Sequence, residues 1–196
     1  MSLERPLKAH PQLTVHRCSA TGSTEYKLQN WKPLDDGSIP TSAWTFFDYV
    51  VVAVFAILQA QLKSRAHWIA ALLYIWLKCN TIISESAIAL PGLGVQLEKH
   101  RGIPHTPFSA SISLSCSRTF IPMASIKDIV INEGLRRWDV RFYLAIIHQA
   151  QSASPAEEFI RIAIPFQEIQ PPFPILKEVY HGLRETLYDE YGEDET

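Results

Sequence analysis

A block of forty residues with few charges, residues 44–83, constrains the fold of this chain more than any other feature. It contains four charged side chains, in a chain of 196 residues with 18 basic and 20 acidic groups. Two mainly apolar runs, residues 44–62 and 68–83, flank the more polar residues 63–67. Each run is close to the ~17–20 residues that a helix needs to cross a hydrocarbon core of about 30 Å. Because neither run has a polar face at the helical period, the block predicts a helical hairpin in a membrane. The alternative is a pair of buried helices in a soluble bundle.

Aromatic, basic and cysteine residues bear on how such a hairpin would sit. Trp44, Trp68 and Trp76 lie near the ends of the runs, where aromatic side chains meet the headgroup layer. Lys63 and Arg65 in the connecting loop favour a cytosolic loop. The three cysteines are odd in number and lack zinc-site spacing, which favours reduced thiols and cytosolic flanking regions. A hairpin that enters the bilayer without crossing it would reconcile these two expectations.

The sequence after the apolar block has the pattern of β-strands. Polar and apolar residues alternate at 109–116 and 158–166, and residues 126–133 and 140–149 are rich in β-branched residues. An Asn-Glu-Gly sequence at 132–134 indicates a turn. We therefore expect about five antiparallel strands at hairpin spacing.

The last element has a helical period. Ile175, Val179, Leu183 and Leu187 recur every four residues after Pro174, which predicts an amphipathic helix. The predicted fold class is therefore α+β. An apolar helical hairpin in a membrane precedes an antiparallel-sheet, pleckstrin-homology-like domain, which the C-terminal helix closes. Other α+β plans fit the pattern as well.

Four regions are expected along the chain. They are an N-terminal cytosolic segment (residues 1–43), the membrane hairpin (44–83), the pleckstrin-homology-like domain (84–188) and an acidic tail (189–196). The tail has five acidic residues among eight, which predicts a solvated segment.

No sequence motif indicates catalysis, metal binding or cofactor binding. The seven histidines lack metal-ligand spacing, and no Gly-x-Ser-x-Gly elbow occurs. Gly92 and Gly94 are too few for a phosphate or dinucleotide loop and indicate a tight turn. The net charge of −2 gives no general case for nucleic acid. We therefore expect no metal, no cofactor and no catalytic site of the chain's own.

Two basic residues, Arg136 and Arg137, precede Trp138 in a predicted loop. Loop cations near a membrane segment can contact anionic lipid headgroups. The alternative is ordinary solubilising charge.

Five strings stand out between residues 84 and 188. They read ESAIALPGLGVQLEKH, FIPMASIKDIVINEGL, FYLAII, IPF and ILKEVYHGLRETL. In order and spacing they resemble the PIG-H family, which supplies a subunit of phosphatidylinositol N-acetylglucosaminyltransferase. The apolar block occurs where that family has its membrane segment.

The resemblance implies an accessory subunit of the complex that transfers N-acetylglucosamine from UDP-N-acetylglucosamine to phosphatidylinositol. This transfer is the first step of GPI-anchor biosynthesis. The resemblance also implies a place in the endoplasmic reticulum membrane, with the main domain and both termini in the cytosol. The implied partners are a catalytic glycosyltransferase subunit of PIG-A type and other membrane subunits. The resemblance assigns no catalytic residue to this chain.

Residues in two of the strings are expected to form a docking surface for the catalytic subunit or, alternatively, to maintain the fold. They are Pro91, Gly92, Gly94, Gln96, Glu98, Lys127, Asp128, Asn132 and Glu133. A stand-alone membrane-anchored, pleckstrin-homology-like lipid-binding adaptor is the alternative function. A glycosyltransferase in its own right is disfavoured, because the strand-rich region has no α/β alternation.

Overall fold

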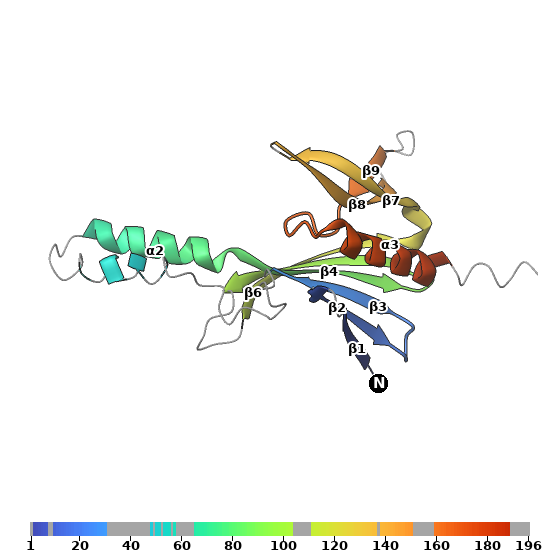
Figure 1. Cartoon of the computed structure of the whole chain (residues 1–196), viewed down its shortest axis with the longest axis horizontal. Coiled ribbons are helices and arrows are strands. Elements are labelled where there is room, and N and C mark those ends of the chain that lie inside the picture. The colour runs from blue at the N-terminus through green and yellow to red at the C-terminus, as the bar shows by residue number, and fades with distance from the viewer. Residues whose placement is uncertain are drawn as a thin grey trace, which may run out of the picture. The chain divides into compact units, whose positions relative to one another are not determined.

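Strands make up most of the described part of the chain. The computed structural model describes residues 2–7, 10–30, 48, 50–51, 53–55, 57, 65–103, 111–136, 138–150 and 159–188. Figure 1 shows their elements. The strands are β1 (Ser2–Leu7), β2 (His10–Cys18), β3 (Thr24–Gln29), β4 (Thr81–Leu90), β5 (Gly94–Ile103), β6 (Ile112–Pro122), β7 (Ile126–Arg136), β8 (Asp139–Ala150) and β9 (Phe159–Ala163). The helices are α2 (Arg65–Cys79), the short 3-10 helix η1 (Met123–Ser125) and α3 (Phe173–Tyr188).

The strands belong to two sheets. One has six strands in the order β1-β2-β3-β4-β5-β6, and the other has three in the order β7-β8-β9. The pairs β1–β2, β2–β3, β3–β4, β7–β8 and β8–β9 are antiparallel. By its internal contacts the chain divides into two compact units, and the division falls within β4, β5 and β6. Unit 1 comprises Met1–Asn30, Ser84–Lys99 and Ser117–Thr196, and unit 2 comprises Trp31–Ile83 and His100–Cys116.

The core of unit 1 begins with the alternation of residues along β3. Thr24, Tyr26 and Leu28 are buried, whereas the residues between them are partly exposed, as the pleat of a strand requires. In the pairing of β3 with β4, Tyr26 lies opposite Ala87 and Leu28 lies opposite Glu85. The buried face of β3 therefore continues onto β4.

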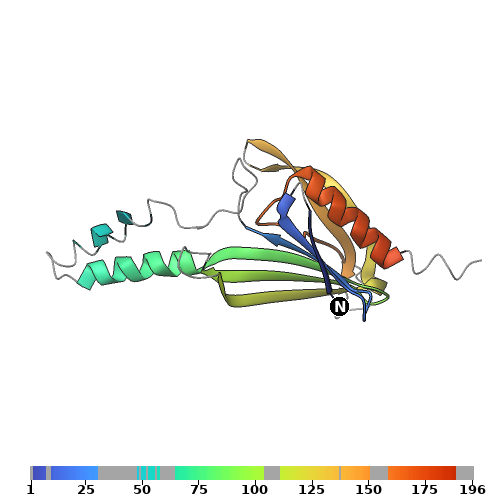
Figure 2. The ribbon, with the colours of Figure 1, turned by 60° about the horizontal axis from the view of Figure 1, so that its bottom comes forward.

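Helix α3 covers this core with one apolar face. Ile175, Leu176, Val179, Leu183 and Leu187 are buried, at spacings that place them on one side of a helix. The helix contacts β3, β7 and β8, and Figure 2 shows it (red) beside the strands of the three-stranded sheet. Residues of both sheets thus share one core within unit 1.

The β7–β8 hairpin is longer than the sequence predicts. Asn132 pairs with Tyr143, and the pairing continues to Arg136 and Asp139. The predicted turn at residues 132–134 is therefore wrong, and the chain reverses after Arg136. Pairing of β7 with the apolar β8 outweighs the local turn preference of Asn-Glu-Gly.

The predicted fold class is wrong, because the described residues form antiparallel sheets with few helices and no apolar membrane hairpin. Helix α2 has 15 residues, which at about 1.5 Å per residue is shorter than a hydrocarbon core of ~30 Å. No helix among the described residues is both long and apolar enough to span a membrane. Much of the first predicted run, residues 44–62, lies outside the described residues. The six-stranded sheet also includes β1, β2 and β3 from ahead of the block, which the predicted pleckstrin-homology-like plan left out.

Within unit 2, α2 carries both a polar contact and an exposed apolar surface. Asp48 accepts a hydrogen bond of 2.5 Å from the Tyr74 hydroxyl, and the rings of Phe55 and Tyr74 lie 6.3 Å apart. The apolar block therefore contains a buried carboxylate bonded to a phenol. Its exposed large apolar residues on α2 are Trp68, Ile69, Leu72, Leu73, Trp76 and Leu77.

Candidate functional site

Glu85 on β4 is a buried carboxylate held by a backbone loop and a lysine. The residue is 1% exposed. Its Oε2 accepts hydrogen bonds of 3.2 Å from the backbone N–H groups of Glu168 and Ile169. Lys99 Nζ on β5 lies 3.3 Å from Oε1 as an ion pair that lacks hydrogen-bond geometry. Because a buried charge is costly without such partners, Glu85 ties the loop before α3 to β4.

The turn between β4 and β5 contains three of the predicted site residues: Pro91, Gly92 and Gly94. Gly92 and Gly94 have φ angles of +67° and +139°, which favour glycine. A Cβ on Gly94 would lie 2.1 Å from the backbone oxygen of Ile121. The backbone N–H of Met123 also donates a 2.8 Å hydrogen bond to the carbonyl of Leu93. This part of the first family string therefore shapes the turn and its contact with the end of β6.

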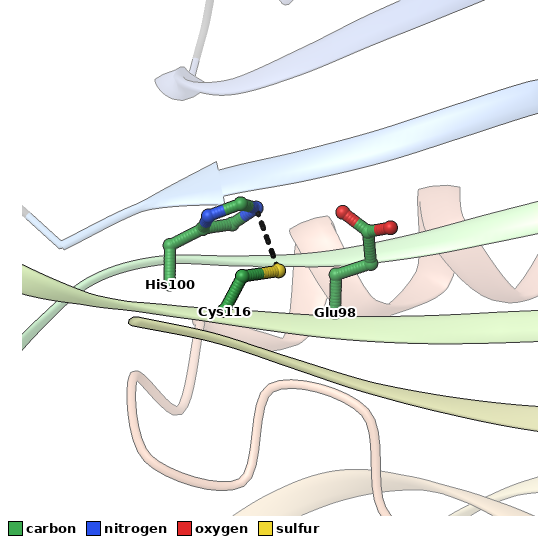
Figure 3. A group of neighbouring side chains, drawn as sticks. All are labelled: Glu98, His100 and Cys116. Atoms are coloured by element: carbon green, nitrogen blue, oxygen red, sulfur yellow. Dashed lines mark hydrogen bonds between the residues drawn. The ribbon is translucent and has the colours of Figure 1, made fainter. Parts of the chain in front are cut away.

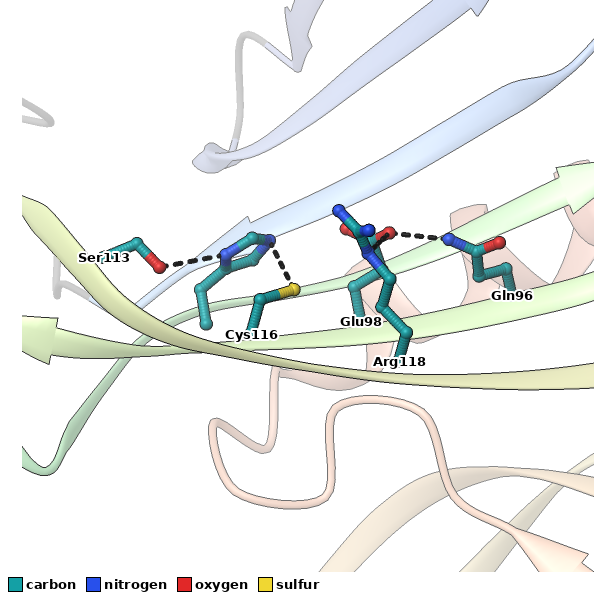
Figure 4. A network of polar contacts seen from close by, with 6 residues as sticks. Gln96, Glu98, Ser113, Cys116 and Arg118 are labelled. Atoms are coloured by element: carbon teal, nitrogen blue, oxygen red, sulfur yellow. Dashed lines mark hydrogen bonds and ion pairs between the residues drawn. The ribbon is translucent and has the colours of Figure 1, made fainter.

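Gln96 and Glu98 on β5 belong to a polar network within unit 1. Glu98 Oε1 accepts a 2.6 Å hydrogen bond from Gln96 Nε2 and lies 2.8 Å from Arg118 Nε on β6. Figure 4 shows the contacts of Gln96 and Arg118 with the carboxylate. The network satisfies a largely buried carboxylate, and its geometry is that of a fold-maintaining contact.

The remaining predicted docking residues lie on β7, and all four side chains are exposed. Lys127 occupies a register shift between Ile126 and Asp128. Asp128 lies near the end of α3, where burial raises the pKa of Tyr188 and the charge of Asp128 raises it further. Asn132 and Glu133 lie further along the strand. The structure thus separates Lys127 and Asp128 from Asn132 and Glu133.

A groove of 520 Å³ lies between the β7–β8 hairpin and α3. Asn132 and Glu133, two of the predicted docking residues, line it from β7. The residues that complete the lining are Ile131, Phe142, Phe173, Lys177, Tyr180 and His181. The four contributed by α3 were not singled out from the sequence, although Lys177, Tyr180 and His181 belong to the last family string.

The groove is lined by aromatic side chains and by charged groups of both signs. The rings of Phe142 and Phe173 lie 4.9 Å apart, and the ring of Tyr180 meets that of His181 edge-on at 5.4 Å. Glu133 supplies an acidic group, and Lys177 supplies a basic one. Apolar pockets with a polar rim are the usual anatomy of a protein-binding surface.

One of the two predicted lipid-contact residues lies at the tip of the β7–β8 hairpin. Arg136 is the last residue of β7, and Arg137 lies outside the described residues. The neighbouring apolar side chains project into solvent, since Leu135 is 84% exposed and Trp138 is 101% exposed. The tip therefore places large apolar groups next to two arginines in the sequence.

Unit 2 contains a polar cluster that the histidine spacing did not reveal. Figure 3 shows the His100 imidazole turned toward Cys116, with Nε2 3.8 Å from Sγ. Nδ1 of the same ring lies 3.2 Å from Ser113 Oγ. These residues meet because β5 and β6 are neighbours in the sheet. The only sequence signal for the cluster was the alternation of polar and apolar residues along β6.

In unit 1 the strands form antiparallel sheet packed on helix α3, and a groove lies between this helix and the β7–β8 hairpin. Residues 86–173 match the family model described as "GPI-GlcNAc transferase complex, PIG-H component". This match confirms the resemblance of the strings to the PIG-H family. The matched segment includes the turn, the Glu98 network and all of β7 and β8.

Curated relatives carry matching names. The chain is 31% identical over 96 residues to phosphatidylinositol N-acetylglucosaminyltransferase subunit gpi15 of Schizosaccharomyces pombe, covering 49% of each chain. It is 31% identical over 106 residues to the H-subunit of that transferase from Mus musculus, and 33% identical over 108 residues to the H-subunit from Homo sapiens. Each of these matches covers 54% of this chain and 50% of the relative. The chain therefore spans about half the length of the curated relatives it matches. No solved structure matches the chain.

Proposed function

We propose that this chain is an accessory subunit of the complex that transfers N-acetylglucosamine from UDP-N-acetylglucosamine to phosphatidylinositol, the first step of GPI-anchor biosynthesis. The observation that carries the proposal is the PIG-H match over residues 86–173. The names of the relatives, all subunits of phosphatidylinositol N-acetylglucosaminyltransferase, support it.

The groove between the β7–β8 hairpin and α3 is the proposed contact with the catalytic subunit, a glycosyltransferase of PIG-A type. The exposed aromatic rings of Phe142 and Phe173 in its lining can pack against an apolar side chain of the partner. Glu133 and Lys177, which also line the groove, can select the orientation of the partner through charge. The turn residues and the Glu98 network then serve the fold and do not contact the partner.

The proposed location is the endoplasmic reticulum membrane, with the main domain and both termini on the cytosolic side. The lipid substrate named by the relatives supports a membrane site. The free thiols of Cys18 and Cys116 support a reducing compartment.

The transfer of labelled N-acetylglucosamine from UDP-N-acetylglucosamine to phosphatidylinositol in microsomes tests the proposal. Microsomes from cells depleted of this chain are compared with microsomes from depleted cells that re-express it. We expect loss of transfer on depletion and recovery on re-expression. Full activity after verified depletion would reject the subunit function.

Charge reversals in the re-expressed chain test the groove. Glu133→Lys and Lys177→Glu alter the lining of the groove. Lys127→Glu alters an exposed position of β7 that does not line the groove. We expect the first two to reduce co-purification of the catalytic subunit and the third to leave it unchanged. Equal effects of all three would show that the contact is not confined to the groove. Unchanged assembly in all three would remove the groove from the interface.

The hairpin tip supports a second candidate function, contact with anionic lipid headgroups by Arg136 and Arg137. The exposed Leu135 and Trp138 favour it, because aromatic and basic residues together suit a membrane surface. Replacement of both arginines by Gln is expected to reduce co-sedimentation with vesicles of phosphatidylcholine and phosphatidylinositol. Binding that is equal to that of the wild type would exclude this contact.

A further inference from the structure

Within unit 2, the His100 imidazole contacts a thiol through one ring nitrogen and a hydroxyl through the other. Cys116 Sγ on β6 lies 3.8 Å from His100 Nε2 on β5, which is hydrogen-bond distance for sulfur. Ser113 Oγ lies 3.2 Å from His100 Nδ1. Figure 3 shows the Cys116 thiol directed toward the His100 ring, and Figure 4 shows Ser113 and Cys116 each in contact with the imidazole. We propose that Cys116 is a nucleophilic thiol, activated by His100, that accepts an acyl group from a thioester.

The first support is the orientation of the imidazole. In the tautomer that donates Nδ1–H to Ser113 Oγ, Nε2 presents its lone pair to the Cys116 thiol. The thiolate is the reactive form of cysteine, and a neighbouring base generates it. A nucleophile, a base and a third group that orients the base form the arrangement that proteins use for acyl transfer.

The second support is access. Cys116 is exposed, and every described residue of β6 from Ile112 to Phe120 is exposed as well. The apolar residues Ile112 and Leu114 on this strand are 48% and 59% exposed. An acyl chain bonded to Cys116 therefore has apolar surface on the same strand to lie against, which a small polar modifier would not use.

The reaction exchanges one thioester for another. The Cys116 S–H proton moves to His100 Nε2 as the sulfur forms a bond to the carbonyl carbon of the donor. The bond between that carbon and the donor sulfur then breaks, and His100 returns the proton to the departing thiolate. The products are acylated Cys116 and the free donor thiol, with no change in oxidation state.

The purified full chain, incubated with octanoyl-coenzyme A, provides the test. Peptide mass spectrometry follows acylation of Cys116 and of Cys18, which serves as the internal reference. We expect His100→Gln to slow acylation of Cys116 by about tenfold or more, since a general base typically contributes about 10²–10⁴-fold. Acylation of Cys18 should be the same in both proteins. Ser113→Ala should slow Cys116 less than His100→Gln does, and Ser113→Thr should restore its rate.

Further variants separate activation from structural damage. His181→Gln, a substitution on α3, should leave the rate at Cys116 unchanged, and circular dichroism should show the same spectrum for every variant. An unchanged rate in a folded His100→Gln protein would overturn the proposal. It would also be overturned if Cys116 of the wild type reacted only after treatment with a metal chelator, because the thiol would then be a metal ligand.

Discussion

Gly182 of α3 packs directly against the phenol of Tyr26 on β3, and a Cβ on residue 182 would lie 1.7 Å from the Tyr26 hydroxyl oxygen. Both residues are buried. A glycine within a helix usually costs about 1 kcal/mol relative to alanine. Here the absence of a side chain is what allows the helix to approach the sheet, so the packing requirement outweighs the helix propensity.

Gly182→Ala is therefore expected to destabilise the protein. Overpacking of a core typically costs about 1–3 kcal/mol, which exceeds the gain of about 1 kcal/mol in helix propensity. Urea unfolding followed by circular dichroism measures the difference in the free energy of unfolding. Glu185→Ala, at an exposed position of the same helix, is the matched control and should change stability little.

The double variant Tyr26→Phe/Gly182→Ala tests whether the contact with Tyr26 causes the destabilisation by Gly182→Ala. Loss of the hydroxyl removes the closest contact, but the ring carbon Cζ would still lie 2.5 Å from the new Cβ. We therefore expect partial recovery of stability relative to Gly182→Ala alone, as coupled neighbours show. A Gly182→Ala protein as stable as the wild type would contradict this account of the packing.

The two glycines of the β4–β5 turn should respond differently to alanine. Gly92 has a φ of +67°, and a Cβ at this residue would have no other atom within 4 Å, so Gly92→Ala should cost about 1–2 kcal/mol, the usual penalty of the left-handed conformation. Gly94→Ala would also place Cβ 2.1 Å from the Ile121 oxygen and 2.8 Å from the Met123 nitrogen. We expect a clearly larger loss for Gly94→Ala in the same urea titration. Equal losses would show that the contact with β6 relaxes at no cost.

Sequence periodicity located some elements but not their partners. The recurrence of Ile175, Val179, Leu183 and Leu187 coincides with α3 because a helix buries one face whatever it packs on. The contacts of Glu85 with residues 168 and 169 join positions 83 and 84 apart in the chain. No local pattern encodes such a pairing, so the sequence did not single out Glu85.

The apolar block illustrates a different limit. Its composition indicated membrane helices, but composition does not fix where a helix ends, and α2 closes at Cys79 just before β4 begins at Thr81. The candidate sites were likewise predicted only in part from local sequence. Asn132 and Glu133 were found through their family string, whereas the α3 side of their groove and the His100–Cys116 contact depend on pairings between distant residues.

Glu85→Gln is expected to destabilise the protein and loosen the loop ahead of α3. The substitution removes the charge that faces Lys99 and weakens the two backbone hydrogen bonds, and hydrogen bonds to charged groups contribute about 1.5–3 kcal/mol each. The loop also lines a cavity of about 230 Å³ together with Gly134 and Tyr143. Hydrogen exchange at the amides of Glu168 and Ile169 should therefore become faster, and the free energy of unfolding should fall by about 2 kcal/mol or more.

Two further variants show whether the buried carboxylate of Glu85 is what holds the loop. Glu168→Gln, which changes an exposed side chain of the same loop, should leave the exchange rates nearly unchanged. Lys99→Met should destabilise the protein, because it leaves the buried carboxylate without its cation. Unchanged exchange at both amides in Glu85→Gln would show that the loop is held by other contacts.

Tyr74 should titrate at unusually high pH because of Asp48. The hydrogen bond to Asp48, then burial, then the negative charge of Asp48 raise the pKa of Tyr74 from 10.0 to about 12. A raised pKa means that the folded state favours the protonated phenol. This contact therefore stabilises the fold fully below pH 10, and the stabilisation is lost as pH rises from 10 through about 12.

Asp48→Asn should bring the pKa of Tyr74 back toward 10. NMR of ¹³Cζ-labelled tyrosine measures this pKa, and Tyr74→Phe assigns the signal. Tyr188, whose pKa burial raises, is the control and should titrate identically in both proteins. If Tyr74 of the wild type titrated at its ordinary pKa, the contact between Asp48 and α2 would not persist in solution.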